Sequence, residues 1–320
     1  MISLKLRSWL RGVLCASLTL VSSSAFAWPD RPIELIVGFA AGGGTDLTAR
    51  TLATYLEKEL GGPVVVVNKA GASGALGLAY VARAKPDGYT LGVTNMPGLL
   101  TLPIEREAGF NFESFTYLGT LVRDPSAFSV SAESPYQNLK ELIDDARKQP
   151  GLLSYASTGV GTDDHLAMVL FNSDTGVELN HVPFNGAAPM RNAVLGGHAT
   201  IGGMNLGEAM PYQGTKLRIL GQASEKRSPL APDVPTFIEQ GVNLVFASER
   251  GVVAPKDLPA EVQVKISDAL EKIAADPKFQ DAMHKQFTEM DYLRGDAWKV
   301  RLKKADDHFR ALWAKQQWID

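Results

Sequence analysis

Short apolar runs alternate with amphipathic stretches along most of this 320-residue chain. The first unit of the pattern is an apolar run at 33–39, a glycine-rich turn at 40–45 and a stretch at 46–60 whose apolar residues recur every three or four positions. Such a unit predicts a strand, a tight turn and a helix that packs on the strand. Its repetition predicts an α/β protein with largely parallel sheets.

The pattern continues through the rest of the chain. Asn138, followed by Glu141, has the spacing of a capping box at the start of a helix that ends before Pro150. Pro259 suits the first turn of a long helix. We expect further strands at 64–67, 89–94, 152–156, 179–182, 199–202 and 217–221, and further helices at 75–84, from 163, at 189–195, before 241 and twice near the C-terminus.

The length of the chain predicts two lobes. Even without its first 27 residues, the chain is much longer than a typical domain of about 100–150 residues. We place the crossings between the lobes near Arg123 and Glu249. One lobe would then comprise residues 28–123 and 250–320, and the other lobe residues 124–249.

The first 27 residues have the parts of an export signal in the usual order. Three basic residues precede an apolar run at 12–21, and Ala25-Phe26-Ala27 supplies small residues for a cleavage site before Trp28. The apolar run is too short to cross a bilayer of about 30 Å. Cys15 lies inside this segment, after Leu14, where a lipoprotein would have a small residue. We therefore expect a periplasmic protein, cleaved after Ala27, that retains no cysteine.

Charge and composition argue against several kinds of partner. Removal of residues 1–27 takes away three basic and no acidic residues, so the formal net charge falls from −3 to −6. A mildly acidic protein is poorly suited to the phosphate backbone, and no nucleic-acid partner is expected. The histidines are scattered without the spacing of metal ligands, so no metal or other cofactor is expected.

The two glycine-rich turns, at 40–45 and 157–162, are the strongest candidates for a binding site because each joins a strand to a helix. The first N–H groups of a helix lack partners within it, and the helix dipole adds partial positive charge there. Two such helix starts facing each other across a cleft would hold a carboxylate without any arginine. The alternative is that these glycines only make tight turns. Their pairing in an exported two-lobe chain favours binding.

Several polar residues have two interpretations each. Asn95 and Asn205 follow predicted strands, where ligands gather in open α/β sheets, or they simply cap turns. Asp46 stands at a helix start, where it can pair with Arg50 four residues later, and we also expect it to shape the ligand loop. Arg250 would either pair with a ligand carboxylate or form a salt bridge between the lobes.

Ser157, Asp163 and His165 lie close in sequence and suggest a catalytic triad. No G-x-S-x-G elbow surrounds Ser157, however, and His165 falls in the first turn of a helix. Helix capping and loop hydrogen bonds account for these residues better, and no catalytic residue is assigned. A secreted hydrolase that uses Ser157 and His165 is retained as a minor alternative.

The chain resembles the Bug family, the extracytoplasmic solute receptors of tripartite tricarboxylate transporters. The resemblance covers essentially everything after residue 27. It is carried by WPDRPI at 28–33, GFAAGGGTD at 38–46, AR at 49–50, NKAGASG at 68–74, AKPDGYTL at 84–91, STGVGT at 157–162, HL at 165–166, HVPFNG at 181–186, LGGH at 195–198 and PDVPT at 232–236.

This resemblance implies a two-lobe, periplasmic-binding-protein-like (flytrap) α/β fold, in which each lobe is a mostly parallel sheet flanked by helices. It implies a solute-binding protein, not an enzyme. The two turns would hold a carboxylate group of the ligand, which would be a dicarboxylate, a tricarboxylate or an aromatic carboxylate. The protein would be a monomer that docks on the membrane subunits of a transporter, or else on a signalling partner. The expected ligand-binding residues are Phe39, Ala40, Ala41, Gly43, Gly44, Thr45, Asp46, Asn95, Ser157, Thr158, Gly159, Gly161, Thr162 and Asn205.

Two departures from the family pattern leave the identity of the carboxylate open. Many members carry an aromatic W-x-G stretch where this chain has Glu249-Arg250-Gly251, as some tricarboxylate-type members do. Members that bind amino dicarboxylates often have Asp after the Gly-Gly-His segment, where this chain has Ala199-Thr200-Ile201.

Overall fold

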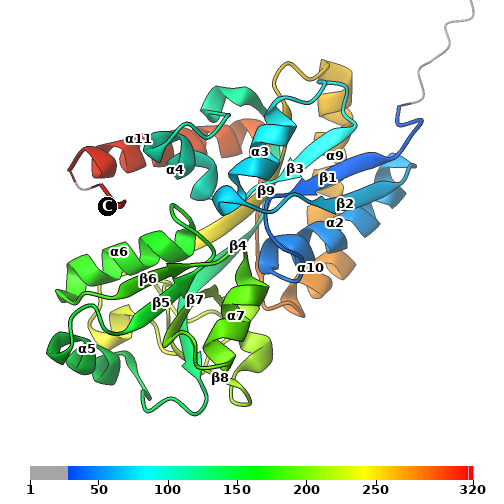
Figure 1. Cartoon of the computed structure of the whole chain (residues 1–320). Helices are drawn as coiled ribbons and strands as arrows, with labels where there is room; N and C mark the ends of the chain where they lie inside the picture. Colours follow the sequence, from blue (N-terminus) through cyan, green and yellow to red (C-terminus); the bar gives the residue numbers. More distant parts are fainter. Residues whose placement is uncertain (1–27, 316, 320) are drawn as a thin grey trace, which may run out of the picture.

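The computed structural model describes residues 28–315 and 317–319. The predicted signal peptide, with Cys15 and the cleavage site after Ala27, lies outside the described residues. Two lobes are joined by two long strands, β4 (Phe115–Ser131) and β9 (Ala247–Pro255), which run diagonally through the centre of the molecule (Figure 1). Within the described residues, no helix is both long enough and apolar enough to span a bilayer.

Each lobe is built on a core of three parallel strands. In the first lobe these are β2 (Val64–Asn68), β1 (Ile33–Val37) and β3 (Thr90–Val93). In the second lobe they are β6 (Asn180–Pro183), β5 (Ser154–Ser157) and β7 (Ile201–Asn205). The predicted two-lobe α/β fold is thus confirmed.

The sheet as a whole is mixed, because the crossing strands run antiparallel to their neighbours. β9 pairs with β3 and with β4, and β4 also pairs with β7. Two further antiparallel strands also pair with β4: β10 (Glu289–Arg294) with residues 119–123, and β8 (Leu217–Gln222) with residues 127–131. The continuous order of strands is β2-β1-β3-β9-β4-β7-β5-β6.

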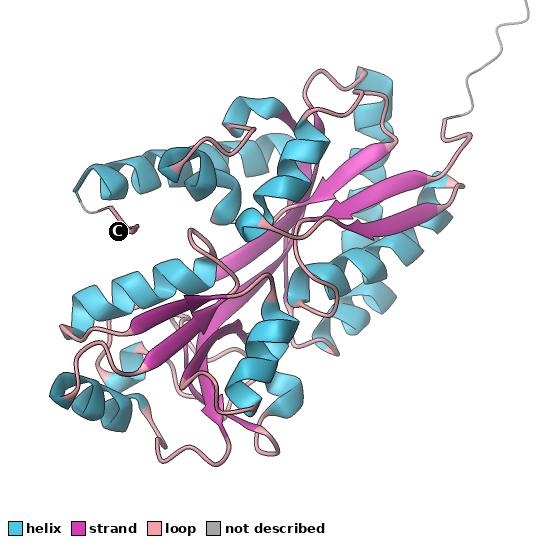
Figure 2. Cartoon of the chain, in the orientation of Figure 1, coloured by secondary structure: helices cyan, strands magenta, loops and turns pink. Residues whose placement is uncertain are grey.

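Helices cover both faces of the sheet in the first lobe (Figure 2). Alternate residues of β1 explain this arrangement, since Leu35 and Val37 pack in one buried cluster and Ile36 in another. The first cluster is closed by α2 (Gly44–Leu60), α9 (Ala260–Ala275) and α10 (Pro277–His284), and the second by α3 (Ala75–Ala82), α4 (Gly98–Glu105) and α11 (Gly295–Lys315).

The second lobe follows the same rule. Phe128 and Tyr155 pack with one pair of helices, whereas the adjacent Ala127 and Ala156 face the other pair. The helices are α5 (Leu139–Lys148) and α6 (Asp163–Thr175) on one side, and α7 (Ala187–Leu195) and α8 (Leu206–Ala209) on the other. As predicted, Asn138 caps α5 by accepting a hydrogen bond from the Glu141 N–H (3.0 Å).

The residues at which we expected the chain to cross between the lobes are direct neighbours. Arg123 of β4 and Glu249 of β9 are register partners in the antiparallel pair that links the lobes. The register shifts twice along this pair, between Tyr117 and Gly119 and between Thr120 and Val122. Such bulges bend a strand locally and increase its twist.

Candidate ligand-binding site

The first glycine-rich turn, between β1 and α2, is held in shape by Asp46. Its Oδ2 accepts hydrogen bonds from the Gly42 N–H (2.9 Å) and from Arg50 Nε (2.9 Å), and its Oδ1 accepts one from Asn68 Nδ2 (2.8 Å). Burial disfavours the charge of Asp46, but the hydrogen bonds from Arg50, Gly42 and Asn68 together lower its pKa. The predicted pairing with Arg50 is confirmed. The hydrogen bond from Asn68 to Asp46 was not predicted.

The second glycine-rich turn, between β5 and α6, is fixed by the first turn of its helix. Asp164 Oδ2 accepts hydrogen bonds from the N–H (3.1 Å) and the hydroxyl (2.6 Å) of Thr158. Nδ1 of His165 accepts one from the Gly161 N–H (3.2 Å). Each turn therefore has a backbone conformation that is set by side chains at the start of the following helix.

The first turn makes hydrogen bonds across the gap between the lobes. The Gly44 N–H, at the start of α2, donates to Glu208 Oε1 of α8 (2.7 Å). The Ala40 N–H donates to the carbonyl of Asn185 in the other lobe (3.2 Å). These hydrogen bonds join the first turn to the second lobe, so the structure is a closed form.

The turns enclose a small cavity. Only about 10 Å³ of it is open to the centre of a water molecule, which is about the space that one water needs. A larger ligand therefore requires the lobes to separate and close again around it. The cavity is lined by Phe39, Gly43, Gly44, Thr45, Asn95, Thr158, Asp164, Ala187, Asn205 and Glu208.

Seven of the predicted ligand residues line this cavity, and three lining residues, Asp164, Ala187 and Glu208, were not predicted. Glu208 follows Asn205 by three residues and forms a capping box with it, a spacing that was visible in the sequence. Nothing in the sequence indicated that its carboxylate reaches the other lobe. The predicted residues that belong to the turns or α2 without lining the cavity are Ala40, Ala41, Asp46, Ser157, Gly159, Gly161 and Thr162.

Arg250 does not line the cavity. Its side chain is 1% exposed, with Nη1 at 2.9 Å from Asp124 Oδ2 and Nη2 at 2.9 Å from Asn205 Oδ1. Of the two interpretations of Arg250, the structure shows the salt bridge, which links β9 to β4. Asn205 caps α8, as one of its two interpretations predicted, and it also lines the cavity.

The catalytic triad that the sequence suggested is not assembled. Ser157 Oγ lies 2.6 Å from Nε2 of His181 in β6, not against His165, although the two imidazole rings stack at 4.2 Å between centroids. Asp163 accepts a hydrogen bond from Asn205 Nδ2 instead (2.7 Å). Ser157 is completely buried.

Buried carboxyl groups make the stability of the closed form depend on pH. Burial raises the pKa of Asp163 to about 6, although Asn205 and Arg250 act in the opposite direction. Because the native pKa lies above the ordinary value of about 3.9, the folded protein binds the proton more tightly than the unfolded chain. The contribution of Asp163 is therefore most favourable below pH 4 and is lost as the pH rises through 6.

Asp163→Asn is accordingly expected to gain stability, relative to the unmodified protein, as the pH rises. A shift of about two pKa units changes the difference between the unfolding free energies of the two proteins by roughly 3 kcal/mol between pH 4 and pH 7.5. Urea denaturation of both proteins at the two pH values measures the difference. The comparison is needed because burial also lowers the pKa of His165 to about 3, which gives the opposite slope in both proteins. Parallel pH profiles would contradict the assignment.

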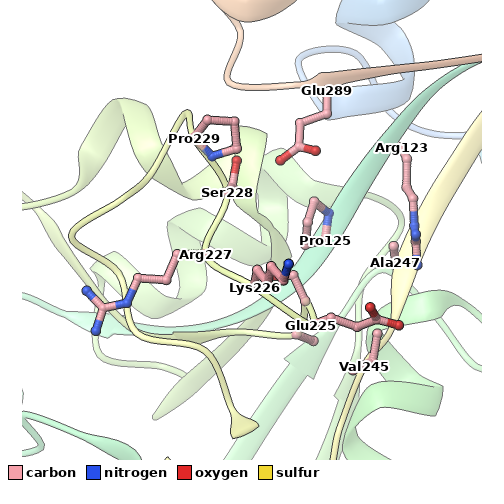
Figure 3. Close-up of a pocket in the computed structure, with 12 residues that line it drawn as sticks. Arg123, Pro125, Glu225, Lys226, Arg227, Ser228, Pro229, Val245, Ala247 and Glu289 are labelled. Carbon is pink, nitrogen blue, oxygen red and sulfur yellow. The ribbon is translucent and has the colours of Figure 1, made fainter. Parts of the chain in front are cut away.

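A larger cavity of about 320 Å³ lies where the lobes join (Figure 3). Charged side chains of both signs surround it, among them Arg123, Lys226 and Glu289. It contains none of the predicted ligand residues and neither glycine-rich turn. The smaller cavity between the turns is therefore the better candidate for the ligand site.

Comparison with known proteins agrees with this geometry. Residues 48–308 match the family model described as the tripartite tricarboxylate transporter family receptor. A Cupriavidus necator protein, named as the UPF0065 protein in the gbd 5' region, is 36% identical over 277 residues, which cover 85% of this chain and 83% of that protein.

Solved structures extend the similarity to the fold. The periplasmic binding protein BugD is 33% identical, with a TM-score of 0.84 over 90% of this chain and 98% of BugD. The R. palustris protein Rpa4515, solved with adipate, is 29% identical, with a TM-score of 0.83 over 90% of this chain and 96% of that one. With most of its length matched by the family model, this chain belongs to the receptor family of the tripartite tricarboxylate transporters.

Proposed function

We propose that this receptor captures a small di-, tri- or aromatic carboxylate in the cavity between its lobes. The observation that carries the proposal is that the cavity is walled by the start of α2, where Gly44 and Thr45 lie, and by Thr158 of the opposite turn. Free N–H groups at a helix start favour an anion. The Gly44 N–H already holds a carboxylate in the closed form, that of Glu208. Rpa4515, solved with adipate, supports the same class of ligand.

The proposal extends to the compartment, the oligomeric state, the membrane partner and the bounds of the lobes. The chain acts in the periplasm after cleavage behind Ala27, as a monomer, and delivers its ligand to the membrane subunits of a tripartite tricarboxylate transporter. Its lobes comprise residues 28–123 with 250–320 and residues 124–249. The ligand residues are those that line the cavity, supported by the rest of the two turns.

A thermal-unfolding screen of the mature protein against organic acids tests the proposal. A ligand present at about 100 times its dissociation constant stabilises the folded state by about 2.7 kcal/mol, which raises the melting temperature by several degrees. We expect at least one di-, tri- or aromatic carboxylate to do so. If neutral sugars or amines stabilise the protein and no organic acid does, the carboxylate site is wrong.

The hydrolase alternative assigns catalysis to Ser157 and His165, but Ser157 Oγ contacts His181 instead. The Oγ of Ser157 also accepts a hydrogen bond from the Gly159 N–H (3.0 Å), as expected of a residue that holds the turn. Hydrolysis of activated esters that Ser157→Ala abolishes would favour the enzyme. Saturable binding without turnover favours the receptor.

A further inference from the structure

In the closed form, the start of α2 is capped by a residue of the opposite lobe. Its N-cap residue, Gly43, has no side chain that could accept a hydrogen bond from the first turn of the helix. The Gly44 N–H donates instead to Oε1 of Glu208 (2.7 Å), which lies 164 residues further along the chain. A carboxylate at this position is stabilised by the free N–H groups and by the helix dipole. Glu208 therefore occupies the position that we propose for the carboxylate of the ligand.

The side chain of Glu208 is held from both lobes. Its Oε2 accepts a hydrogen bond from the Asn205 N–H of the second lobe (3.2 Å), while its Oε1 accepts from Gly44 of the first lobe. The residue is 8% exposed, so little water competes for these hydrogen bonds. Asp164, the other acidic residue of the lining, bonds to Thr158 of its own turn. Glu208 is thus the acidic lining residue that bridges the lobes.

A buried guanidinium strengthens the attraction for a carboxylate at this position. A Cβ on Gly44 would lie 2.5 Å from Arg250 Nη2 and 3.0 Å from Glu208 Oε1, so both groups flank the same residue. Burial opposes the charge of Arg250, but the attraction of Asp124 and Glu208 raises its pKa. The start of α2 and Arg250 therefore attract the carboxylate of Glu208 together, and they would attract a ligand carboxylate in the same way.

The cavity has no room for a ligand carboxylate beside that of Glu208. Its free space is about 10 Å³, which is about the space that one water needs. A ligand carboxylate that accepts from the Gly44 N–H must displace Oε1 of Glu208, and two negative charges held close together repel each other. Ligand binding therefore has to break the hydrogen bond between Gly44 and Glu208.

We infer that Glu208 is an internal competitor of the ligand, which occupies the ligand's carboxylate position, holds the empty lobes together and lowers the apparent affinity of the receptor. The inference rests on the proposed carboxylate site and adds a form of regulation to it. A protein whose binding-competent form is only partly populated binds its ligand more weakly by that fraction. Removal of the Glu208 carboxylate should therefore tighten ligand binding, whereas removal of a group that helps to hold the ligand would weaken it.

Glu208→Gln removes the charge and keeps the shape of the side chain. With one oxygen left, it can accept from Gly44 or from Asn205 but not from both. Because hydrogen bonds to charged groups are stronger than neutral ones, we expect the affinity for the best acid from the thermal screen to rise at least about tenfold. Calorimetry on the mature protein measures this rise. Without ligand, small-angle scattering should give a larger radius of gyration for the variant than for the unmodified protein.

Glu208→Ala provides a test that needs no knowledge of the ligand. The substitution deletes a carboxylate and the methylene next to it, which together match acetate. Excess acetate at constant ionic strength should raise the melting temperature of this variant by several degrees and reduce its radius of gyration. The unmodified protein, in which Glu208 fills the position, should respond much less. Acetamide, which has the same shape and no charge, should have neither effect on the variant.

Glu239→Ala is the matched control. Glu239 belongs to the same lobe and also follows its capping partner by three residues. Its Oε2 accepts from the Thr236 N–H (2.8 Å), and its own N–H donates to Thr236 Oγ1 (3.0 Å). It pairs with Arg227, which lies in that lobe too. Circular dichroism first establishes that both alanine variants are folded. We expect Glu239→Ala to show neither tighter ligand binding nor a response to acetate.

The outcomes separate this inference from the proposed function. If Glu208→Gln binds the acids more weakly than the unmodified protein does, Glu208 assists the ligand, so the competition is wrong and the carboxylate site stands. If Glu239→Ala changes as Glu208→Ala does, a lost cap explains both and the competition is again wrong. The same holds if acetate stabilises Glu208→Ala no more than the unmodified protein. If no organic acid binds either the unmodified protein or Glu208→Gln, Glu208 competes with nothing and both proposals fail.

Discussion

Arg250→Ala is expected to lower the free energy of unfolding by about 3–5 kcal/mol, the usual loss when one partner of a buried ion pair is removed. The guanidinium is fully enclosed between Asp124 and Asn205, so the substitution leaves the Asp124 carboxylate buried without its cation. Burial already raises the pKa of Asp124 to about 6 despite the attraction of Arg250. Denaturation in urea at pH 7.5 measures the loss.

Two further variants control this result. Arg294 also makes two ion pairs, with Asp268 and Glu271, but its side chain is 42% exposed, so Arg294→Ala should cost at most about 1 kcal/mol. Asp124→Asn on the Arg250→Ala background should restore part of the loss, because it removes the unpaired charge and keeps an oxygen for the Gly207 N–H. Equal losses for the two arginine variants would contradict the importance of burial.

Gly44→Ala is expected to weaken ligand binding by about 5- to 150-fold while leaving the protein folded. A Cβ at this position would lie 2.5 Å from Nη2 of Arg250 and 3.0 Å from Oε1 of Glu208. The guanidinium cannot move aside easily, because two hydrogen bonds hold it. Overpacking of this kind costs about 1–3 kcal/mol, which corresponds to that range of affinity. Alanine otherwise suits a helix better than glycine does.

Gly43→Ala is the matched control for this variant. It is the preceding residue, and its φ of −91° suits any residue. Its Cβ would come no closer than 3.3 Å to a neighbour, the Cβ of Ala187, and would lie 3.6 Å from Oε1 of Glu208. We expect a several-fold smaller loss of affinity, measured by calorimetry with the best acid from the screen. A loss as large as that of Gly44→Ala would show that the backbone of the whole turn is sensitive, and that the close approach to Arg250 is not the cause.

The sequence was sufficient where local patterns decide the structure. The glycine-rich turns, the helices that follow them and the cap at Asn138 depend on residues a few positions apart, and all are found where expected. The pairing of Asp46 with Arg50 is equally local. Four residues is one helical turn, so this contact needs no knowledge of the rest of the fold.

The long crossing strand β4 was missed because it breaks the ordinary rules for a strand. It contains Pro125, which argues against a central strand, and the polar Arg123 and Asp124 interrupt its apolar pattern. Its two ends belong to different lobes and pack against different clusters, so no single period describes it. Helix α4 was missed for a similar reason, since Pro103 lies inside it.

The cavity residues Asp164 and Glu208 could not be found from spacing alone. Each looks like an ordinary acidic residue in the first turn of a helix, where such residues are common. Their significance depends on which turns the two lobes bring together. That arrangement is a property of the closed form and involves residues 164 positions apart, as in the hydrogen bond from Gly44 to Glu208.

The pair of strands that joins the lobes also determines how they can move. β4 and β9 stay paired, with two shifts of register, from Phe115 and Pro255 to Pro125 and Ala247, so a two-stranded antiparallel ribbon connects the lobes. Its two bulges, between Tyr117 and Gly119 and between Thr120 and Val122, lie within the first lobe, where they increase the local twist. The ribbon resists sliding of one strand along the other, because sliding would break a row of backbone hydrogen bonds at once. We therefore expect the lobes to open and close by bending of this ribbon, so that each closure brings the same two helix starts together.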